Sequence, residues 1–309
     1  MRAIASPASL KGVLTAAEAA AALAEGMRSA GADAVELPIA DGGEGTADAL
    51  RLARGGEWQE AEVHDAFGAR RAARWLLLPD GTAVVEAAAA VPLDPSRLDP
   101  LAASSRGFGE LVGAALAAGA KELLLGLGGT ATMDAGVGFL TVLGAMPVRS
   151  RVACDVTAKL MEAPRLFGPQ KGAGPAEVAE FERRFAALDQ FASVQHKPFT
   201  GAAGGLGAAL AMLGGELVPG APLVLDEVGF DASGFDLVVT GEGRVDATTA
   251  LGKAPGEVVR RSGGARCVVF GGVVEQPVSG AETVALSGDP ARARDDLVVL
   301  GRKLVSGRG

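Results

Sequence analysis

Carboxylates gather in three glycine-rich stretches, each of which is expected to form a turn at the end of a β-prone run. These are Asp41–Thr46 (DGGEGT), Gly128–Asp134 (GGTATMD) and Gly241–Asp246 (GEGRVD). Glycine lets backbone N–H groups approach a phosphate closely, and a helix that begins just beyond adds its positive end. Carboxylates beside phosphate need a divalent cation, and Mg²⁺ prefers a few carboxylates together with substrate oxygens. The pattern therefore predicts an enzyme that handles phosphate or a nucleotide.

Basic side chains adjoin glycines at several further positions. Such cations offset the negative charge of a phosphoryl group during its transfer. The carboxylates of the three stretches are Asp41, Glu44, Asp134, Glu242 and Asp246, and the basic residues are Lys11, Arg106, Lys171, Arg244 and Lys253.

The elements that position these residues alternate between short β-prone runs and Ala- and Leu-rich helical runs. This alternation is typical of an α/β protein with a largely parallel sheet, in which ligands bind at the carboxyl ends of the strands. Thr15 and Glu18 have the spacing of a capping box before a helix. We expect strands at 2–6, 35–40, 83–91, 122–128, 152–155, 236–240 and 267–271, and helices at 19–30, 111–118, 177–191 and after the glycines of 201–207.

Composition limits the class of protein. The chain has 309 residues, of which 49% are hydrophobic, and its net charge is −8. This length suggests two domains, and the negative charge argues against nucleic acid or an anionic membrane as a partner. Two histidines and two widely spaced cysteines exclude a His-rich metal site and a zinc ribbon. Without a membrane-length apolar run or a secretory signal, we expect a cytoplasmic protein with reduced thiols.

Two common nucleotide-binding motifs are incomplete or absent in this sequence. Residues 126–131 fit the G-x-G-x-x-A fingerprint of dinucleotide-binding enzymes, but no acidic residue follows about 20 positions later. The phosphate loop G-x-x-x-x-G-K-[ST] is absent, because Ala254 follows Gly252 and Lys253. The glycines of 201–207 allow either close helix packing or a second anion site. His64 and His196 are expected to be surface or satisfied polar residues.

The motifs together resemble a known family. They lie, in order, at residues 40–46, 126–138, 154–157, 167–173, 201–207 and 241–246, the last with Gly252 and Lys253. In sequence and in order they resemble the motifs of the glycerate kinases of the bacterial glycerate 2-kinase type. The resemblance extends from Lys11 to about Gly272.

This resemblance implies Mg²⁺-dependent transfer of phosphate from ATP to D-glycerate, giving 2-phosphoglycerate. It also implies two α/β domains with the active site in the cleft between them. One domain is expected from 1–64 together with 234–309, and the inserted domain from 65–233. A homodimer is left open.

The resemblance also implies which residues form the site, when the family's functional positions are matched to this sequence one by one. Asp41 is expected to act as the base or to orient the substrate hydroxyl, and Lys11 to stabilise the transferred phosphoryl group. The catalytic candidates are Lys11, Asp41, Glu44 and Asp155. Candidates for binding substrate or nucleotide are Gly42, Gly43, Gly45, Thr46, Ser105, Arg106, Gly128, Gly129, Thr130, Asp134, Lys171, Gly204, Gly205, Gly241, Gly243, Arg244 and Lys253, and those for binding the metal are Glu242 and Asp246.

Departures from the family pattern and the fingerprint at 126–131 keep other functions open. The segment between Gly144 and Val152 and the portion after Gly272 are shorter than the family pattern, and Ala158 and Lys159 follow Thr157 in place of the usual Asn-Pro. Ala8 stands where the family usually has an acidic residue, which removes one polar group from the expected site. A relative with weakened activity or another small hydroxy acid as substrate is one alternative, and a non-catalytic binding protein of the same fold is another. A dinucleotide-dependent oxidoreductase is the third.

Overall fold

The chain forms two compact units, which are described separately. The computed structural model describes residues 1–249 and 252–307. Unit 1 consists of Met1–Asp41, Asp48–Ala53 and Ala221–Gly309, and unit 2 of Gly42–Ala47 and Arg54–Gly220. No helix in the described part of the chain is long and apolar enough to span a membrane.

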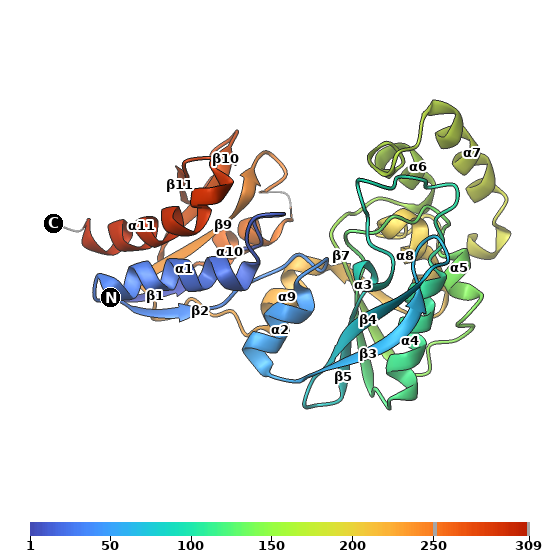
Figure 1. Cartoon of the computed structure of the whole chain (residues 1–309), viewed down its shortest axis with the longest axis horizontal. Helices are drawn as coiled ribbons and strands as arrows, with labels where there is room; N and C mark the ends of the chain where they lie inside the picture. Colours follow the sequence, from blue (N-terminus) through green and yellow to red (C-terminus); the bar gives the residue numbers. More distant parts are fainter. Residues whose placement is uncertain (250–251, 308–309) are drawn as a thin grey trace. The chain divides into compact units, whose positions relative to one another are not determined.

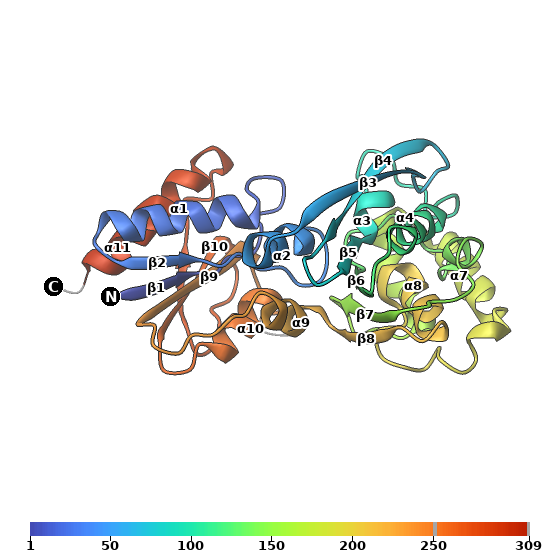
Figure 2. The same ribbon diagram turned by 90° about the horizontal axis from the view of Figure 1, so that it is seen from below.

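Unit 1 is built on a parallel sheet of five strands in the order β11-β10-β9-β1-β2 (Figure 1). Its central strands are almost continuous apolar runs, because helices cover both faces. Helices α1 and α11 lie on one face and α10 on the other (Figure 2). The strands are β1 (Arg2–Ala5), β2 (Asp33–Glu36), β9 (Leu237–Val245), β10 (Arg266–Val274) and β11 (Glu282–Ala285), and the helices are α1 (Ala16–Ser29), α9 (Gly220–Glu227), α10 (Ala254–Arg261) and α11 (Ala293–Ser306).

Glycines bring α1 and α11 into close contact. A Cβ on Gly26 would lie 2.0 Å from the carbonyl oxygen of Val298, and one on Gly301 would lie 2.3 Å from that of Leu23. Neither position has room for a side chain, since real Cβ contacts of that length do not occur. The predicted capping box at the start of α1 is confirmed, because the Thr15 hydroxyl accepts from the Glu18 N–H and the Glu18 carboxylate accepts from the Thr15 N–H.

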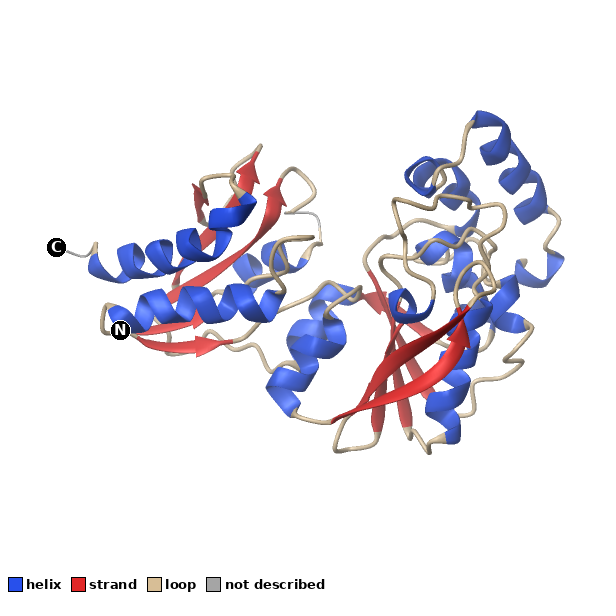
Figure 3. Cartoon of the chain, in the orientation of Figure 1, coloured by secondary structure: helices blue, strands red, loops and turns tan. Residues whose placement is uncertain are grey.

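Unit 2 contains a six-stranded sheet in the order β3-β4-β5-β6-β7-β8, seen in red in Figure 3. Strands β5 to β8 are parallel, and β3, β4 and β5 pair antiparallel. The strands are β3 (Glu57–His64), β4 (Arg70–Leu77), β5 (Thr82–Glu86), β6 (Glu122–Gly126), β7 (Arg149–Cys154) and β8 (Glu216–Pro219). The helices are α2 (Thr46–Arg54), whose middle belongs to unit 1, and α3 (Ala87–Ala90), α4 (Arg106–Ala117), α5 (Val137–Leu140), α6 (Ala163–Phe167), α7 (Pro175–Ala186) and α8 (Ala202–Met212).

The predicted α/β class is confirmed, and every expected strand overlaps an observed one. Several ends are wrong. The strand expected at 35–40 stops at Glu36, because Pro38 has no N–H to donate to a neighbouring strand. The strand expected at 83–91 stops at Glu86, and the alanines that follow form α3, in keeping with their high helix propensity. The helix expected at 177–191 ends at Ala186, and a separate turn then buries Phe191 beside Phe181.

The limits of the units differ from those expected from the sequence. The chain passes between units after residues 41, 47, 53 and 220, whereas the limits expected from the sequence are 64 and 233. The first difference has a clear cause, since β3 pairs along its whole length with β4 and so belongs to unit 2. Residues 250–251 and 308–309 of the expected domain at 234–309 lie outside the described residues.

Candidate active site

A cavity of about 430 Å³ opens in unit 1 at the carboxyl ends of its strands. Its walls come from the segment after β1, the ends of β9 and β10, and the segments after β2 and β11. This is the edge of a parallel sheet at which α/β proteins bind ligands. Of the residues predicted from the sequence, the cavity gathers Lys11, Asp41, Glu242, Gly243, Arg244, Asp246 and Lys253.

The third glycine-rich stretch was expected to be a turn, and this is wrong. Strand β9 continues through it to Val245 and pairs with β10, with Gly241 opposite Phe270 and Arg244 opposite Val273. A Cβ on Gly241 would lie 2.2 Å from the carbonyl oxygen of Phe270. Gly241 therefore allows the close approach of a neighbouring strand, and it does not line the cavity.

Glu242 and Asp246 point toward one cationic group. The Lys253 ammonium lies 3.4 Å from Oε2 of Glu242 and 3.7 Å from Oδ1 of Asp246. Thr249, which is fully buried, donates its hydroxyl to Oε1 of Glu242 at 2.7 Å and accepts from the Asp246 N–H at 3.0 Å. Thr248 bonds Asp246 through both its N–H and its hydroxyl. The two carboxylates are thus held in fixed orientations around one position suited to a cation.

The environment separates the acidities of the two carboxyl groups. Burial raises the pKa of Glu242 above its usual value, against the lowering effect of the Thr249 hydroxyl and the Lys253 ammonium. Hydrogen bonds from the Thr248 hydroxyl and N–H lower the pKa of Asp246. A half-buried carboxylate whose charge is costly gains from a nearby cation, and a metal ion is one such cation.

The carboxylates of the cavity suit a magnesium ion better than a metal that needs several protein ligands. Among residues 1–249 and 252–307, no group of three or more His, Cys, Asp or Glu side chains is arranged to hold a metal ion. Mg²⁺ is commonly bound by only one or two carboxylates with substrate phosphates completing its shell. Glu242 and Asp246 fit that smaller requirement, and Lys253 occupies the position between them.

The cavity's other predicted cations differ in how they are held. The Arg244 guanidinium lies 2.6 Å from Oε1 of Glu275, in an ion pair that is largely exposed. Such pairs contribute at most about 1 kcal/mol, so Arg244 can exchange this partner for a ligand at low cost. Lys11 is exposed at the cavity wall, and Asp41 is half-buried there.

In unit 2, Lys171 is buried, with only 4% of its surface exposed. Its ammonium donates to the carbonyl oxygen of Thr132 at 2.7 Å and to the Thr130 hydroxyl at 3.4 Å. Burial lowers the pKa of Lys171 to about 8, although Asp134 and Asp155 oppose this effect through their charges. A buried ammonium with neutral hydrogen-bond partners is stabilised by an anion.

Asp134 and Ser105 fix the turn beside Lys171. One Asp134 oxygen accepts from the N–H and hydroxyl of Ser105 and from the Gly138 N–H, and the other accepts from the Gly136 N–H. The Ser105 hydroxyl in turn accepts from the Phe139 N–H. These bonds occupy both Asp134 oxygens. We therefore assign Asp134 and Ser105 to positioning the turn at Gly128–Asp134.

The first and second glycine-rich stretches pack against each other. A Cβ on Gly128 would lie 2.7 Å from Cα of Gly43 and 3.3 Å from Oδ2 of Asp155, and a Cβ on Gly126 would lie 2.6 Å from the carbonyl oxygen of Gly42. The backbone of the first stretch therefore packs directly against Gly126 and Gly128 of the fingerprint at 126–131. The Thr46 hydroxyl is buried here without a hydrogen-bond partner in the described structure.

Gly204 and Gly205 serve close packing. With Ala203 they form a run of left-handed residues, with φ of 52°, 67° and 91°, near the start of α8. A Cβ on Gly204 would lie 2.0 Å from the carbonyl oxygen of Thr132, which is also the acceptor for Lys171. The run thus supports the turn that carries Thr130 and Thr132.

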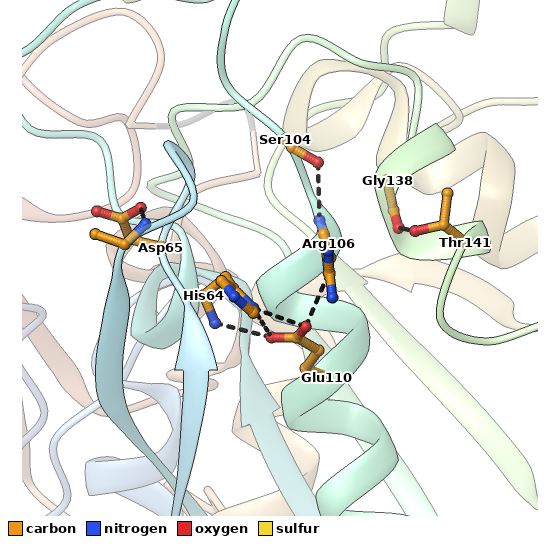
Figure 4. Close-up of polar contacts among 8 residues, drawn as sticks. His64, Asp65, Ser104, Arg106, Glu110, Gly138 and Thr141 are labelled. Carbon is orange, nitrogen blue, oxygen red and sulfur yellow. Dashed lines mark hydrogen bonds and ion pairs between the residues drawn. The ribbon is translucent and has the colours of Figure 1, made fainter.

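Arg106 belongs to a cluster at the start of α4 (Figure 4). Its Nε donates to Glu110 at 2.9 Å, and Nδ1 of His64 lies 2.8 Å from the same carboxylate. Hydrogen bonds from His64 and Arg106 lower the pKa of Glu110 despite burial, which acts in the opposite direction. Glu110 therefore joins α4 to His64 at the end of β3, and Arg106 pairs with this carboxylate within α4. The expectation that His64 is a satisfied polar residue is confirmed, and His196 is exposed.

The remaining candidates lie in turns and loops. Glu44 and Asp155 are exposed, and Gly45 and Gly129 adopt positive φ in the turns that carry them. The sequence did not point to Thr249, although its place three residues after Asp246 is typical of a hydroxyl that closes a turn. Nor did it point to Val273, Leu286, Pro290 and Ala293, which also line the cavity, because apolar residues at these positions look the same in sequence as ordinary core residues.

Known proteins resemble this chain over most of its length. A sequence model of the glycerate kinase family matches residues 3–150 and 146–288. Glycerate 2-kinase of Escherichia coli K12 is 37% identical, covering 82% of this chain and 80% of its own. Glycerate kinase of Bacillus subtilis 168 is also 37% identical, with the same coverage of both chains.

A solved structure has the same fold. It is described as a putative glycerate kinase 2 from Salmonella typhimurium LT2, and it is 30% identical, with a TM-score of 0.84 over 99% of this chain and 98% of that one. The family match covers far more than half of the sequence, and the relatives agree with it. The chain therefore belongs to the glycerate kinase family and is a kinase.

Proposed function

We propose that this kinase transfers the terminal phosphoryl group of ATP to D-glycerate in the presence of Mg²⁺ and forms 2-phosphoglycerate. The observation that carries the proposal is the convergence of Glu242, Asp246 and Lys253 at one point of the unit 1 cavity. Carboxylates and a lysine in one cavity suit a metal-complexed phosphate. Membership of the glycerate kinase family supports glycerate as the acceptor of the phosphoryl group.

Each proposed role follows from charge and position. Bound Mg²⁺ would offset the charge of phosphate oxygens at Glu242 and Asp246. Lys11, exposed at the cavity wall, stabilises charge on the transferred phosphoryl group, and half-buried Asp41 orients or deprotonates the attacking hydroxyl. In unit 2, Lys171 binds an anionic group, because its buried ammonium has only neutral hydrogen-bond partners.

The proposal is tested by measuring ADP release with D-glycerate, ATP and Mg²⁺. ADP formation that depends on D-glycerate and stops in excess EDTA supports the metal-dependent reaction, and turnover that persists in EDTA contradicts it. Asp41→Asn should lower kcat by about 100-fold, because a positioned acid–base group contributes at least that much. The matched control is Asp33→Asn, which changes an exposed aspartate of the same unit that is absent from the cavity lining.

An altered acceptor is the second candidate, and Ala8 is the observation that favours it. If Ala8 changes the acceptor, another small hydroxy acid will give a higher kcat/KM than D-glycerate under the same conditions. D-Glycerate as the best of a panel of hydroxy acids would exclude this alternative.

A further inference from the structure

The unit 1 cavity has an apolar side that the chemistry of phosphate transfer does not use. Besides its charged residues, the cavity is lined by Val273 at the end of β10, Leu286 after β11, and Pro290 and Ala293 at the start of α11. Val273 has 47% of its surface exposed. A large aliphatic side chain exposed inside a cavity provides area for an apolar ligand group.

The size of the cavity points the same way. A volume of about 430 Å³ exceeds what a three-carbon acid fills. Cavities of a few hundred cubic ångströms accommodate ligands with a ring system as well as polar groups. D-Glycerate has an oxygen on every carbon, so apolar side chains would contribute little to its binding.

The topology separates the apolar side from the cationic side. The sheet order β11-β10-β9-β1 places Val273 and Leu286 on the β11 side of Glu242, which lies on β9. Lys253 contacts Glu242, and Lys11 follows β1, the strand on the other side of β9. Phosphates are therefore favoured near β9 and β1, and the remainder of a nucleotide extends toward β11.

Two carboxylates strengthen this orientation. Asp289 and Asp296 line the cavity on the β11 side, where Asp289 accepts from the Ala291 N–H and Asp296 accepts from Ser287. The Arg292 guanidinium lies 3.8 Å from Oδ1 of Asp296 and offsets part of this charge. The remaining negative charge would repel a phosphate, whereas an uncharged nucleoside tolerates it and offers hydroxyl donors to the two carboxylates.

We propose that the β11 side of this cavity, formed by Val273, Leu286 and Pro290, binds the nucleoside part of the nucleotide. The proposal rests on the proposed function, because it assumes that the phosphates lie near Glu242 and Lys253. It adds the surface that binds the base and sugar, and it makes Val273 a determinant of nucleotide affinity.

The test is fluorescence titration of the full chain with N-methylanthraniloyl-ADP in the presence of Mg²⁺. Val273→Arg should raise its Kd about tenfold or more, corresponding to roughly 1.4 kcal/mol. Val273→Thr keeps the shape and adds a hydroxyl, and it should raise Kd about threefold. Val299→Arg is the matched control, because Val299 is 46% exposed in the same unit but does not line the cavity.

The outcomes separate this inference from the proposed function. Weaker nucleotide binding by both Val273 variants, with the KM for D-glycerate within about twofold of the parent in active preparations, supports the nucleoside site. Wild-type binding by Val273→Arg, or displacement of the fluorescent nucleotide by D-glycerate alone, overturns it. If the parent binds the nucleotide through Val273 but does not phosphorylate D-glycerate, the proposed function fails and the nucleoside site stands.

Discussion

Lys171 has a charge that its surroundings stabilise poorly. It is almost fully buried, its hydrogen-bond partners are a carbonyl and a hydroxyl, and its pKa is lowered to about 8. Relative to an ordinary lysine with a pKa of 10.5, keeping the group charged in the folded state costs roughly 3 kcal/mol. A protein that only needed to fill this space would be as stable with an apolar residue, so the charge points to a bound anion.

Replacing Lys171 by Met should raise the KM for D-glycerate at least about tenfold, because a buried charge-assisted contact is worth roughly 1.5–3 kcal/mol. The free energy of unfolding should stay the same or increase, since the variant removes a buried charge. Chemical denaturation and steady-state kinetics measure the two effects. Lys197→Met makes the same change at an exposed lysine of unit 2 and should alter neither. A variant that loses stability but keeps its KM would assign Lys171 a structural role.

The lowered pKa of Lys171 also predicts opposite pH dependences. Between about pH 8 and 10.5, the unfolded chain holds the lysine proton and the folded chain does not. Stability contributed by this residue therefore rises with pH in that window, whereas the affinity for an anion falls as pH rises through about 8. The free energy of unfolding and the KM for D-glycerate are measured for wild type and Lys171→Met at pH 7 and pH 9.5. The difference between the two proteins gives the contribution of Lys171 to the pH dependence of each quantity. Parallel stability curves for the two proteins would contradict the lowered pKa.

Thr249 is a positioning residue for Glu242. Thr249→Val keeps the shape but removes the hydroxyl that donates to Glu242 and accepts from the Asp246 N–H. We expect kcat/KM for ATP to fall about tenfold, because hydrogen bonds to charged groups contribute roughly 1.5–3 kcal/mol. The Mg²⁺ concentration for half-maximal activity should rise. Mn²⁺ binding measured by electron paramagnetic resonance should weaken in parallel.

Thr249→Ser provides the control, because it restores the hydroxyl and removes only a methyl group. Recovery of both metal binding and activity in this variant separates positioning from packing. If Thr249→Ser is as impaired as Thr249→Val, the hydroxyl alone does not position Glu242, and the assignment of Thr249 as a positioning residue through its hydroxyl is contradicted.

Residue types in the sequence predicted chemistry better than they predicted roles. Glu242, Asp246 and Lys253 were named from the sequence, and the fold brings them together. Asp134 and Arg106 were named for the same reasons, yet their polar groups bind Ser105 and Glu110. A charged side chain beside glycine looks the same in sequence whether its partner is a ligand or another residue, and only the folded chain shows which.

At the scale of elements, the left-handed run at the start of α8 supports the turn beside Lys171. Gly204→Ala should destabilise the protein by about 2 kcal/mol more than Gly214→Ala, because overpacking typically costs roughly 1–3 kcal/mol. Both glycines have positive φ, but a Cβ at Gly204 would lie 2.0 Å from a carbonyl oxygen, and one at Gly214 would meet nothing within 4 Å. Thermal and chemical denaturation measure the difference, and equal losses would contradict the packing argument.

The elements themselves were predictable where burial is complete. The central parallel strands are continuous apolar runs and were found from the sequence. The hairpin of β3 and β4 was missed, because its strands carry many charged residues and are only partly buried. The continuation of β9 through Gly241 was missed because glycine and charged residues favour a turn locally, and pairing with β10 overrides that preference.

For the whole molecule, the sequence predicted two domains, but their limits depend on pairing between distant segments. Residues 42–47 belong to unit 2 because Gly42 and Gly43 pack against Gly126 and Gly128, although their neighbours on both sides belong to unit 1. The local amino-acid composition does not indicate that these six residues belong to a different unit from their neighbours in the chain. Family membership, by contrast, depends on ordered motifs along the whole chain, and the sequence predicted it correctly.

The identity of the product tests the central proposal most directly. The purified chain is incubated with D-glycerate, ATP and Mg²⁺, and the product is supplied to enolase without phosphoglycerate mutase. The account predicts phosphoenolpyruvate at a rate that matches ADP release, because enolase accepts only the acid phosphorylated at the 2-position. ADP release that yields phosphoenolpyruvate only after the mutase is added would contradict the proposed product, and no ADP release above a boiled control would contradict the kinase reaction with D-glycerate.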